Sequence, residues 1–181
     1  ARQEGESASG WLVSRAEFSN FKLRLQFKSS YPRFNSGILF RDPGHARVGR
    51  PAFHGFELQL LDDPTGKEAN PGGSIYELAR AFPGKIMAGA WHQIEIHCQG
   101  SHITAYVNGE KTADIHSRRS FKGAIGLQLH GGSRPAELWW KNIEVLELPD
   151  PGCVPFERSL EEEVELAPGR WIDLLAGKSL D

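Results

Sequence analysis

The stretch FELQLLDD, residues 56–63, decides the fold. Its apolar residues at 56, 58 and 60 alternate with Glu57 and Gln59, and two aspartates close the run. Alternation with a period of two predicts a half-buried β-strand. The polar face of this strand offers a carboxylate and an amide, where the solvent face of an ordinary strand carries Lys, Thr or Ser. That choice of side chains raises the question whether the face binds a ligand.

Further short alternating runs extend this pattern along the chain. The sequence holds 20 glycines and 11 prolines between them, and no amphipathic helix separates the runs. The Asn108-Gly109 dipeptide is typical of a tight hairpin turn with positive φ. These features predict an all-β fold, a two-sheet antiparallel sandwich. The expected strands cover residues 21–29, 37–42, 55–62, 74–79, 91–99, 102–108, 110–116, 124–131 and 138–148. The residues expected between the sheets are Leu58, Leu60, Ile94, Ile96, Ile103, Ala105, Leu127 and Leu129.

Length and charge limit the classes of protein to which the chain can belong. A chain of 181 residues is long enough for one domain with a sizeable core and too short for two ordinary ones. Its 21 Lys plus Arg against 23 Asp plus Glu remove the electrostatic argument for a nucleic-acid binder. No apolar run approaches the roughly 20 residues of a membrane span, and the N-terminal stretch ARQEGESASG has no signal-peptide core. We expect an extracytoplasmic location, periplasmic or secreted, with the leader not present in this chain.

Cys98 falls on the apolar phase of the run IEIHC. Buried free cysteines behave as small apolar side chains. We therefore expect Cys98 to be a buried free thiol rather than half of a bridge with Cys153, the only other cysteine of the sequence.

The polar phases of three expected strands add up to one candidate site. Glu57 and Gln59 face away from the core in one strand. Gln128 and His130 do so in a second strand, and Arg41 does so in a third. If these strands share a sheet, one face presents a guanidinium, a carboxylate, two amides and an imidazole, and such groups recognise hydroxyl-rich ligands. The plainer interpretation is a cross-strand ion pair between Arg41 and Glu57 beside a bystander histidine.

Four aromatic residues are candidates for stacking on sugar rings: Tyr76, Trp91, Trp139 and Trp140. Trp139 and Trp140 are adjacent, so in a strand one of them faces the core and the other faces out. For any single tryptophan a position in the core is favoured over a role in binding.

Motifs of other chemistries are missing from the sequence. Its 7 histidines show neither a helical HExxH nor a zinc-type spacing with cysteine. There is no GxSxG elbow, no GxGxxG after a strand and no P-loop. Asp62 and Asp63 before Pro64 could ligate calcium, but turn formation explains them equally well. We expect no metal and no cofactor.

An ordered set of motifs resembles one known family. The blocks NSGILFRD, GFELQLLDD, WHQIEIHCQGSHITAYVNGEKTADI and GAIGLQLHGG follow one another between Gly10 and Leu148. Each motif is weak by itself, but the ordered set resembles the 3-keto-disaccharide hydrolase domain family. The resemblance implies a concanavalin A-like jelly-roll sandwich, related in shape to many glucanases and laminin-G-like lectins.

The resemblance also implies an activity on glycosides whose C3 hydroxyl has been oxidised to a ketone. The ketone acidifies the C2 hydrogen, a base removes it, the enolate expels the C1 alkoxide, and water adds back. We expect His130 as the base, Arg41 as the partner of the enolate oxygen, and Glu57 as the acid or orienting group. The expected substrate-binding residues are Gln59, Gln128, Asn35, Tyr76 and Asp62.

Two other classes of function remain open. A sandwich of this shape also serves as a non-catalytic carbohydrate-binding module of a larger secreted protein, or as a purely structural domain. The expected partners are a saccharide ligand or substrate and further domains of the same polypeptide. No nucleic acid and no membrane span are expected.

The ends of the chain depart from the family's pattern. The family usually opens with a segment like W-x-x-L-F-x-G-K-x-L-x-G-W, which is missing at the front here. A similar stretch, WIDLLAGKSLD, occupies residues 171–181. We expect the sandwich over residues 1–148 and a Pro/Glu-rich linker over 149–170. Residues 171–181 then either begin a second copy of the domain, which we favour, or complete the sandwich as a C-terminal strand.

Overall fold

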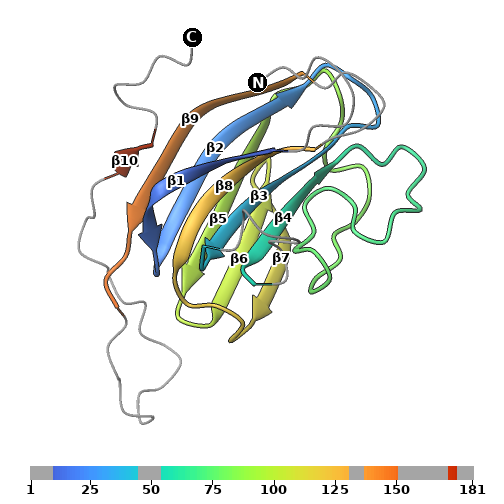
Figure 1. The fold of residues 1–181 in the computed structure, drawn as a ribbon. Helices are drawn as coiled ribbons and strands as arrows, with labels where there is room; N and C mark the ends of the chain where they lie inside the picture. The colour runs from blue at the N-terminus through green and yellow to red at the C-terminus, as the bar shows by residue number, and fades with distance from the viewer. Residues whose placement is uncertain (1–9, 45–53, 131–136, 151–170, 175–181) are drawn as a thin grey trace.

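The computed structural model describes residues 10–44, 54–130, 137–150 and 171–174, which build two antiparallel β-sheets packed face to face (Figure 1). One sheet has four strands in the order β1-β8-β3-β4, and the other has six in the order β10-β9-β2-β5-β6-β7. The expected two-sheet antiparallel sandwich is confirmed. The strands are β1 (Gly10–Phe18), β2 (Phe21–Ser29), β3 (Asn35–Asp42), β4 (Phe56–Leu61), β5 (His92–Gln99), β6 (His102–Val107), β7 (Glu110–His116), β8 (Gly123–Leu129), β9 (Leu138–Glu147) and β10 (Trp171–Asp173).

The core lies between the two sheets and is formed by the inward phase of each strand. The residues predicted to form it are all buried except Leu129, which is half-buried against the others. Complete burial of a Leu or Ile side chain contributes about 1.5–3 kcal/mol. The period-two alternation read from the sequence therefore identifies the side chains that hold the two layers together.

The expectation of a strand over residues 74–79 is wrong. This segment is a tight turn closed by a hydrogen bond from the Ala79 N–H to the Ile75 carbonyl (2.9 Å). Ile75 forms only isolated bridges, to Leu58 and Ala79. Glu77 has a φ of 60°, a left-handed conformation that an extended strand does not contain.

The structure also contains a strand that the sequence did not predict, β1. Most of its side chains are exposed, so its sequence GWLVSRAEF lacks a clear alternation of apolar and polar residues. Its position becomes apparent only from its pairing with β8.

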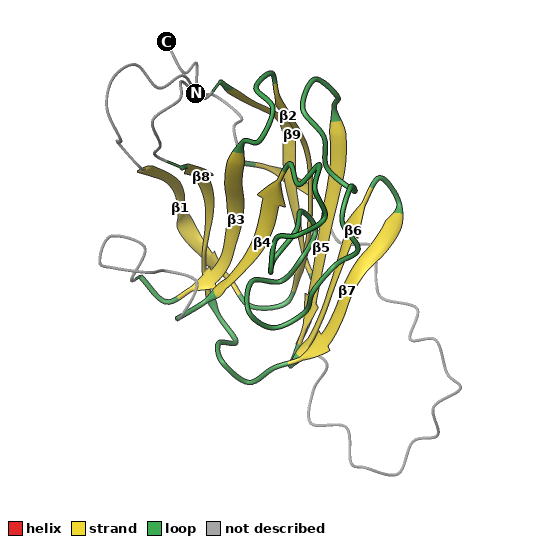
Figure 2. Cartoon of the chain, turned by 90° about the vertical axis from the view of Figure 1, so that its right-hand side faces the viewer, coloured by secondary structure: helices red, strands yellow, loops and turns green. Residues whose placement is uncertain are grey.

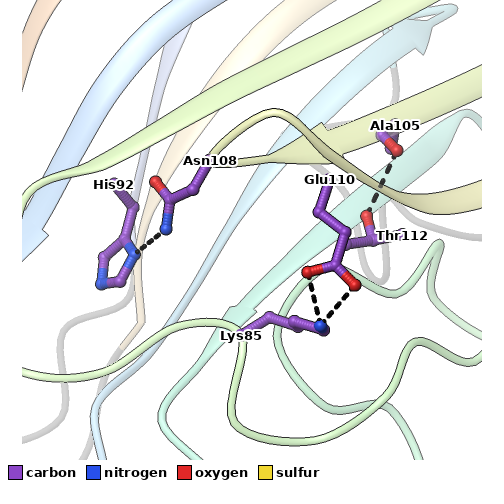
Figure 3. A network of polar contacts seen from close by, with 6 residues as sticks. All are labelled: Lys85, His92, Ala105, Asn108, Glu110 and Thr112. Carbon is purple, nitrogen blue, oxygen red and sulfur yellow. Dashed lines mark hydrogen bonds and ion pairs between the residues drawn. The ribbon is translucent and has the colours of Figure 1, made fainter.

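The long connection between β4 and β5, residues 62–91, closes one side of the sandwich (Figure 2). The Tyr76 N–H donates to the Glu57 carbonyl (2.9 Å), so this part of the loop runs beside the outer edge of β4. Further along, the Lys85 ammonium forms an ion pair with the Glu110 carboxylate of β7 at 2.6 Å (Figure 3). The loop thereby links the edge strands of both sheets and covers the edge of β4, which would otherwise expose unpaired backbone groups.

Asn108 and Gly109 form the turn between β6 and β7, as the sequence predicted. Their φ angles are 53° and 79°. The Asn108 side-chain carbonyl accepts a hydrogen bond from the Gln93 N–H (2.9 Å), and its amide nitrogen lies 3.1 Å from Nδ1 of His92 (Figure 3). The hairpin is thus anchored to the start of β5.

The C-terminal segment reaches the six-stranded sheet. Trp171 pairs with Leu146 and Asp173 pairs with Glu144, which makes β10 an edge strand beside β9. Residues 151–170 and 175–181 lie outside the described residues. The division into a sandwich, a linker and a final segment therefore stays a prediction.

Cys98 is fully buried, as expected, and burial raises the pKa of its thiol to about 12. Cys153 lies outside the described residues. Among the described ranges of the chain, no helix has the length and apolar character needed to cross a membrane.

Candidate functional site

The register of the four-stranded sheet determines which side chains share its outer face. Paired residues in antiparallel strands carry their side chains on the same face of the sheet. Two rows of side chains therefore cross the outer face. These rows are Val13–Gly126–Leu39–Glu57 and Trp11–Gln128–Gly37–Gln59. In the second row, the pair of Gly37 and Gln128 follows from continuing the register by one residue beyond the pair of Ile38 and Leu127. The expected shared face of Glu57, Gln59 and Gln128 is present.

The Glu57 carboxylate lies over Gly37. A Cβ atom built on Gly37 would overlap Oε1 of Glu57 and would lie 2.8 Å from its Cδ. Neighbouring strands are about 4.8 Å apart, so Gln59 and Gln128, on either side of β3, flank Gly37 across about 10 Å. The carboxylate therefore sits between two amide-bearing strands, in a space that exists because residue 37 has no side chain.

Glu57 is buried without a charged partner. Its exposed fraction is 8 %, and among the described residues no hydrogen bond or ion pair reaches its carboxylate. Burial raises the pKa of this carboxyl to about 7. A carboxyl that titrates near neutrality is suited to both accept and donate a proton at physiological pH.

The amides of this face are held in different ways. Gln59 donates from Nε2 to Oδ1 of Asn35 (2.8 Å), which orients both side chains. Oε1 of Gln128 is buried and has no hydrogen-bond partner among the described residues. Because a buried acceptor without a partner costs free energy, such atoms usually meet a water or a ligand. Among the described residues, Gln128 therefore has an acceptor atom whose hydrogen-bonding capacity is unused.

Trp11 adds an aromatic side chain that sequence reasoning missed. A Cβ atom built on Gly126 would lie 3.2 Å from Cε3 of Trp11 and 3.3 Å from Cβ of Leu39. The indole therefore leans over Gly126 beside Leu39, on the face that carries Gln128. The signal is the alternation of Trp11 and Val13, which becomes readable only when the pairing of β1 with β8 is known.

Arg41 does not lie on this face, so the expectation that it converges with Glu57 is not met. Its φ is 49°, and the pairing of β3 with β8 shifts register between Leu39 and Asp42. This irregularity turns the side chain out of the alternation. The buried guanidinium donates to the Ser19 carbonyl (2.8 Å) and to the Gly100 carbonyl (2.7 Å) in the β5–β6 turn. Arg41 therefore ties the two sheets together at one end of the sandwich.

The remaining candidate residues lie at the margins of the face. His130 is exposed and follows the end of β8, two positions after Gln128. Tyr76 is half-buried and meets Glu57 through its backbone N–H. Asp62 accepts a hydrogen bond from the Arg33 N–H (2.9 Å) and thus holds the β2–β3 connection. Among the described residues, no group of three or more His, Cys, Asp or Glu side chains is arranged to hold a metal ion.

Similar solved structures define the class to which this sandwich belongs. A candidate glycosyl hydrolase from Parabacteroides distasonis aligns with a TM-score of 0.65 and 25% identity over 79% of this chain and 84% of that chain. A Bacillus subtilis protein with a galectin-like fold aligns with a TM-score of 0.58 and 12% identity, over 80% of each chain. A carbohydrate-binding module from Bacillus subtilis aligns with a TM-score of 0.55 and 15% identity over 78% of this chain and 83% of that chain. The chain is a jelly-roll sandwich, as the sequence predicted, and it shares this fold with the galectin-like neighbour.

The family follows from the sequence match. Residues 2–146 match the model of the 3-keto-alpha-glucoside-1,2-lyase-like domain. This match spans most of the chain, and the chain belongs to that family, the 3-keto-disaccharide hydrolase domain family whose motifs it resembles. No curated protein matches the chain.

Proposed function

We propose that this chain is a carbohydrate-active domain that cleaves glycosides carrying a ketone at C3, on the outer face of its four-stranded sheet. Membership of the 3-keto-alpha-glucoside-1,2-lyase-like family supports the substrate class, and the likeness to a candidate glycosyl hydrolase supports the reaction type. The observation that carries the proposal is the buried Glu57 carboxyl over Gly37, with amides on both sides.

The chemistry requires one group that takes a proton and returns it. The C3 ketone acidifies the C2–H bond, and the Glu57 carboxylate removes that proton to leave an enolate. The enolate electron pair then forms a C1=C2 double bond as the C1–O bond breaks. The departing alkoxide takes up a proton, which the now protonated Glu57 can supply. Addition of water across the double bond completes the hydrolysis.

The surroundings of Glu57 suit this role. A carboxyl with a pKa near 7 is a stronger base than one in water, and it remains ionised in part at neutral pH. We assign the base role to Glu57 rather than to His130, because Glu57 lies between the amides whereas His130 is exposed beyond the end of its strand. Gln128 would accept a hydrogen bond from a sugar hydroxyl, and Trp11 would offer its ring to the apolar face of the sugar.

A comparison of oxidised and unoxidised substrates tests the proposal. The chain is incubated with a panel of 3-keto-disaccharides and with the parent disaccharides, and products are detected by mass spectrometry and NMR. We expect cleavage of keto-sugars only, because the parents lack an acidic C2 hydrogen. Saturable binding without turnover of any member would make the chain a carbohydrate-binding module instead of an enzyme. The absence of both binding and turnover would contradict a carbohydrate-active role.

A further inference from the structure

The outer face of the six-stranded sheet, on the opposite side of the sandwich from Glu57, holds a second group of polar and aromatic side chains. Register places Gln26 of β2 between Lys141 of β9 and Gln93 of β5, and it pairs Lys28 with Trp139. A polar hollow of about 360 Å³ opens on this face, lined by Arg24, Leu25, Gln26, Gln93, Asn142 and Glu144.

An irregularity in the sheet shapes this hollow. The β2–β9 pairing shifts register between Arg24 and Gln26, and Asn142 opposite has a φ of 52°. Asn142 donates from Nδ2 to Oε1 of Gln26 (3.1 Å), and Gln93 donates from Nε2 to Oε1 of Glu95 (2.9 Å). Three amide side chains line the hollow: those of Gln26, Gln93 and Asn142. Within the described residues, each of them uses only one of its two polar atoms in a hydrogen bond. The other atom of each amide is available to a ligand.

Two tryptophans and two lysines stand beside the hollow. Trp91, directly before β5, is 41 % exposed, and the Lys141 ammonium lies 4.0 Å from the centroid of its ring. The Lys28 ammonium lies 5.4 Å from the centroid of the Trp139 ring. Neither lysine has an acidic partner in the described part of the chain. Both aromatic rings therefore carry a cation that pairs with no carboxylate of the described residues.

We propose that this second face binds an anionic oligosaccharide, one that contains uronate or sulfated sugars. The rings of Trp91 and Trp139 fit the apolar faces of pyranose rings, and the amides fit their hydroxyls. A carboxylate or sulfate on the sugar pairs with Lys28 or Lys141 as the ammonium leaves the indole, so the lost cation–π contact is replaced by an ion pair. A neutral sugar would remove the same contact without replacing it.

Binding measurements with charged and neutralised probes test this assignment. Calorimetry is carried out with a galacturonate hexamer, its methyl-esterified form, a chondroitin sulfate hexasaccharide and an oligothymidylate. We expect binding of at least one of the two acidic saccharides. Methyl esterification should weaken binding of the galacturonate hexamer by at least about tenfold, because it removes the charges that pair with the lysines. Affinity should also fall as the salt concentration is raised, since Lys141 is exposed and Lys28 is only half-buried, and salt screens such charges.

Variants locate the binding and separate it from the proposed catalytic face. Trp91→Ala and Lys141→Gln should each weaken binding of the acidic saccharide by about tenfold. Two control variants should leave binding of the acidic saccharide unchanged. They are Lys122→Gln, which replaces an exposed lysine close to β8, and Glu57→Gln. All variants are first checked for native circular dichroism. The proposal would be overturned if neither acidic saccharide bound, or if the methyl ester bound as tightly as the galacturonate hexamer. It would also be overturned if the oligothymidylate bound as tightly as the acidic saccharide, or if Trp91→Ala and Lys141→Gln bound the acidic saccharide normally.

Discussion

The carboxylate of Glu57 occupies the volume that any side chain at Gly37 would need. The two residues lie in adjacent strands, two residues out of register, because Glu57 pairs with Leu39 while Gly37 pairs with Gln59. The Glu57 side chain thus crosses diagonally onto β3. The glycine is required here by a side chain of the candidate site, which makes Gly37 a probe of that site.

Gly37→Ala should therefore strongly reduce turnover while the protein remains folded. The overlapping atoms are at the far end of a flexible side chain, so Glu57 can turn away at little cost in stability. Displacing the carboxylate by about 1 Å should reduce turnover of a 3-keto-disaccharide by about 10²-fold. Gly10→Ala is the control, because a Cβ atom there meets nothing within 4 Å. Full turnover by Gly37→Ala would argue against a role for this face.

The raised pKa of Glu57 predicts a specific pH dependence of stability. The folded state raises the pKa of this carboxyl from 4.5 to about 7, so it binds the proton more tightly than the unfolded state does. The stabilisation from protonated Glu57 is complete below pH 4.5 and is lost as the pH rises through 7. Relative to Glu57→Gln, the wild type should lose up to about 3 kcal/mol of unfolding free energy between pH 4 and pH 8. Urea denaturation of both proteins across this range measures the difference, and a difference independent of pH would be the contrary result.

Arg41 is expected to matter for stability and not for chemistry. Arg41→Met would leave the Ser19 and Gly100 carbonyls without their donor. The free energy of unfolding should fall by about 2–4 kcal/mol, while turnover per folded molecule stays near that of the wild type. A variant of normal stability that is inactive would instead restore the catalytic role that the sequence predicted for Arg41.

The β6–β7 turn gives an independent test of the fold. Gly109 has a φ of 79°, where a Cβ atom costs about 1–2 kcal/mol. Gly109→Ala should lower the free energy of unfolding by that amount in chemical denaturation. Gly10→Ala, in open space and without a positive φ, should change it by much less. Equal effects of the two substitutions would mean that the turn conformation is not the cause.

Period-two alternation predicted the layers and much of the polar face. It placed Leu58 and Leu60 in the core, and it placed Glu57, Gln59 and Gln128 on one outer face, because side chains in a regular strand alternate strictly. It failed at Arg41, where a left-handed residue and a register shift interrupt the strand. One such irregularity sends the side chain to another side of the sheet, and nothing in the local sequence GILFRD marks it.

The missed residues depend on contacts between strands that are distant in sequence. Trp11 belongs to the site because β1 pairs with β8, and Gly37 does so because Glu57 leans over it. Neither relationship can be read from a single segment. The sequence also did not predict that Glu57 is buried beside a covered sheet edge, because the covering loop was expected to contain a strand at residues 74–79.

Proton exchange at C2 and cleavage of the glycosidic C1–O bond test the central claim most directly. A 3-keto-disaccharide is incubated in D₂O with the wild type, with Glu57→Gln and with His130→Gln, and loss of the C2–H signal and of the glycosidic bond is followed by NMR. We predict that Glu57→Gln slows both processes by about 10²–10⁴-fold, the usual effect of removing a positioned general base. His130→Gln should stay near the wild-type rate, and the wild-type rate should rise through about pH 7 as Glu57 ionises. If Glu57→Gln exchanged the C2 hydrogen and cleaved the glycosidic bond at the rates of the wild type, the account would be contradicted.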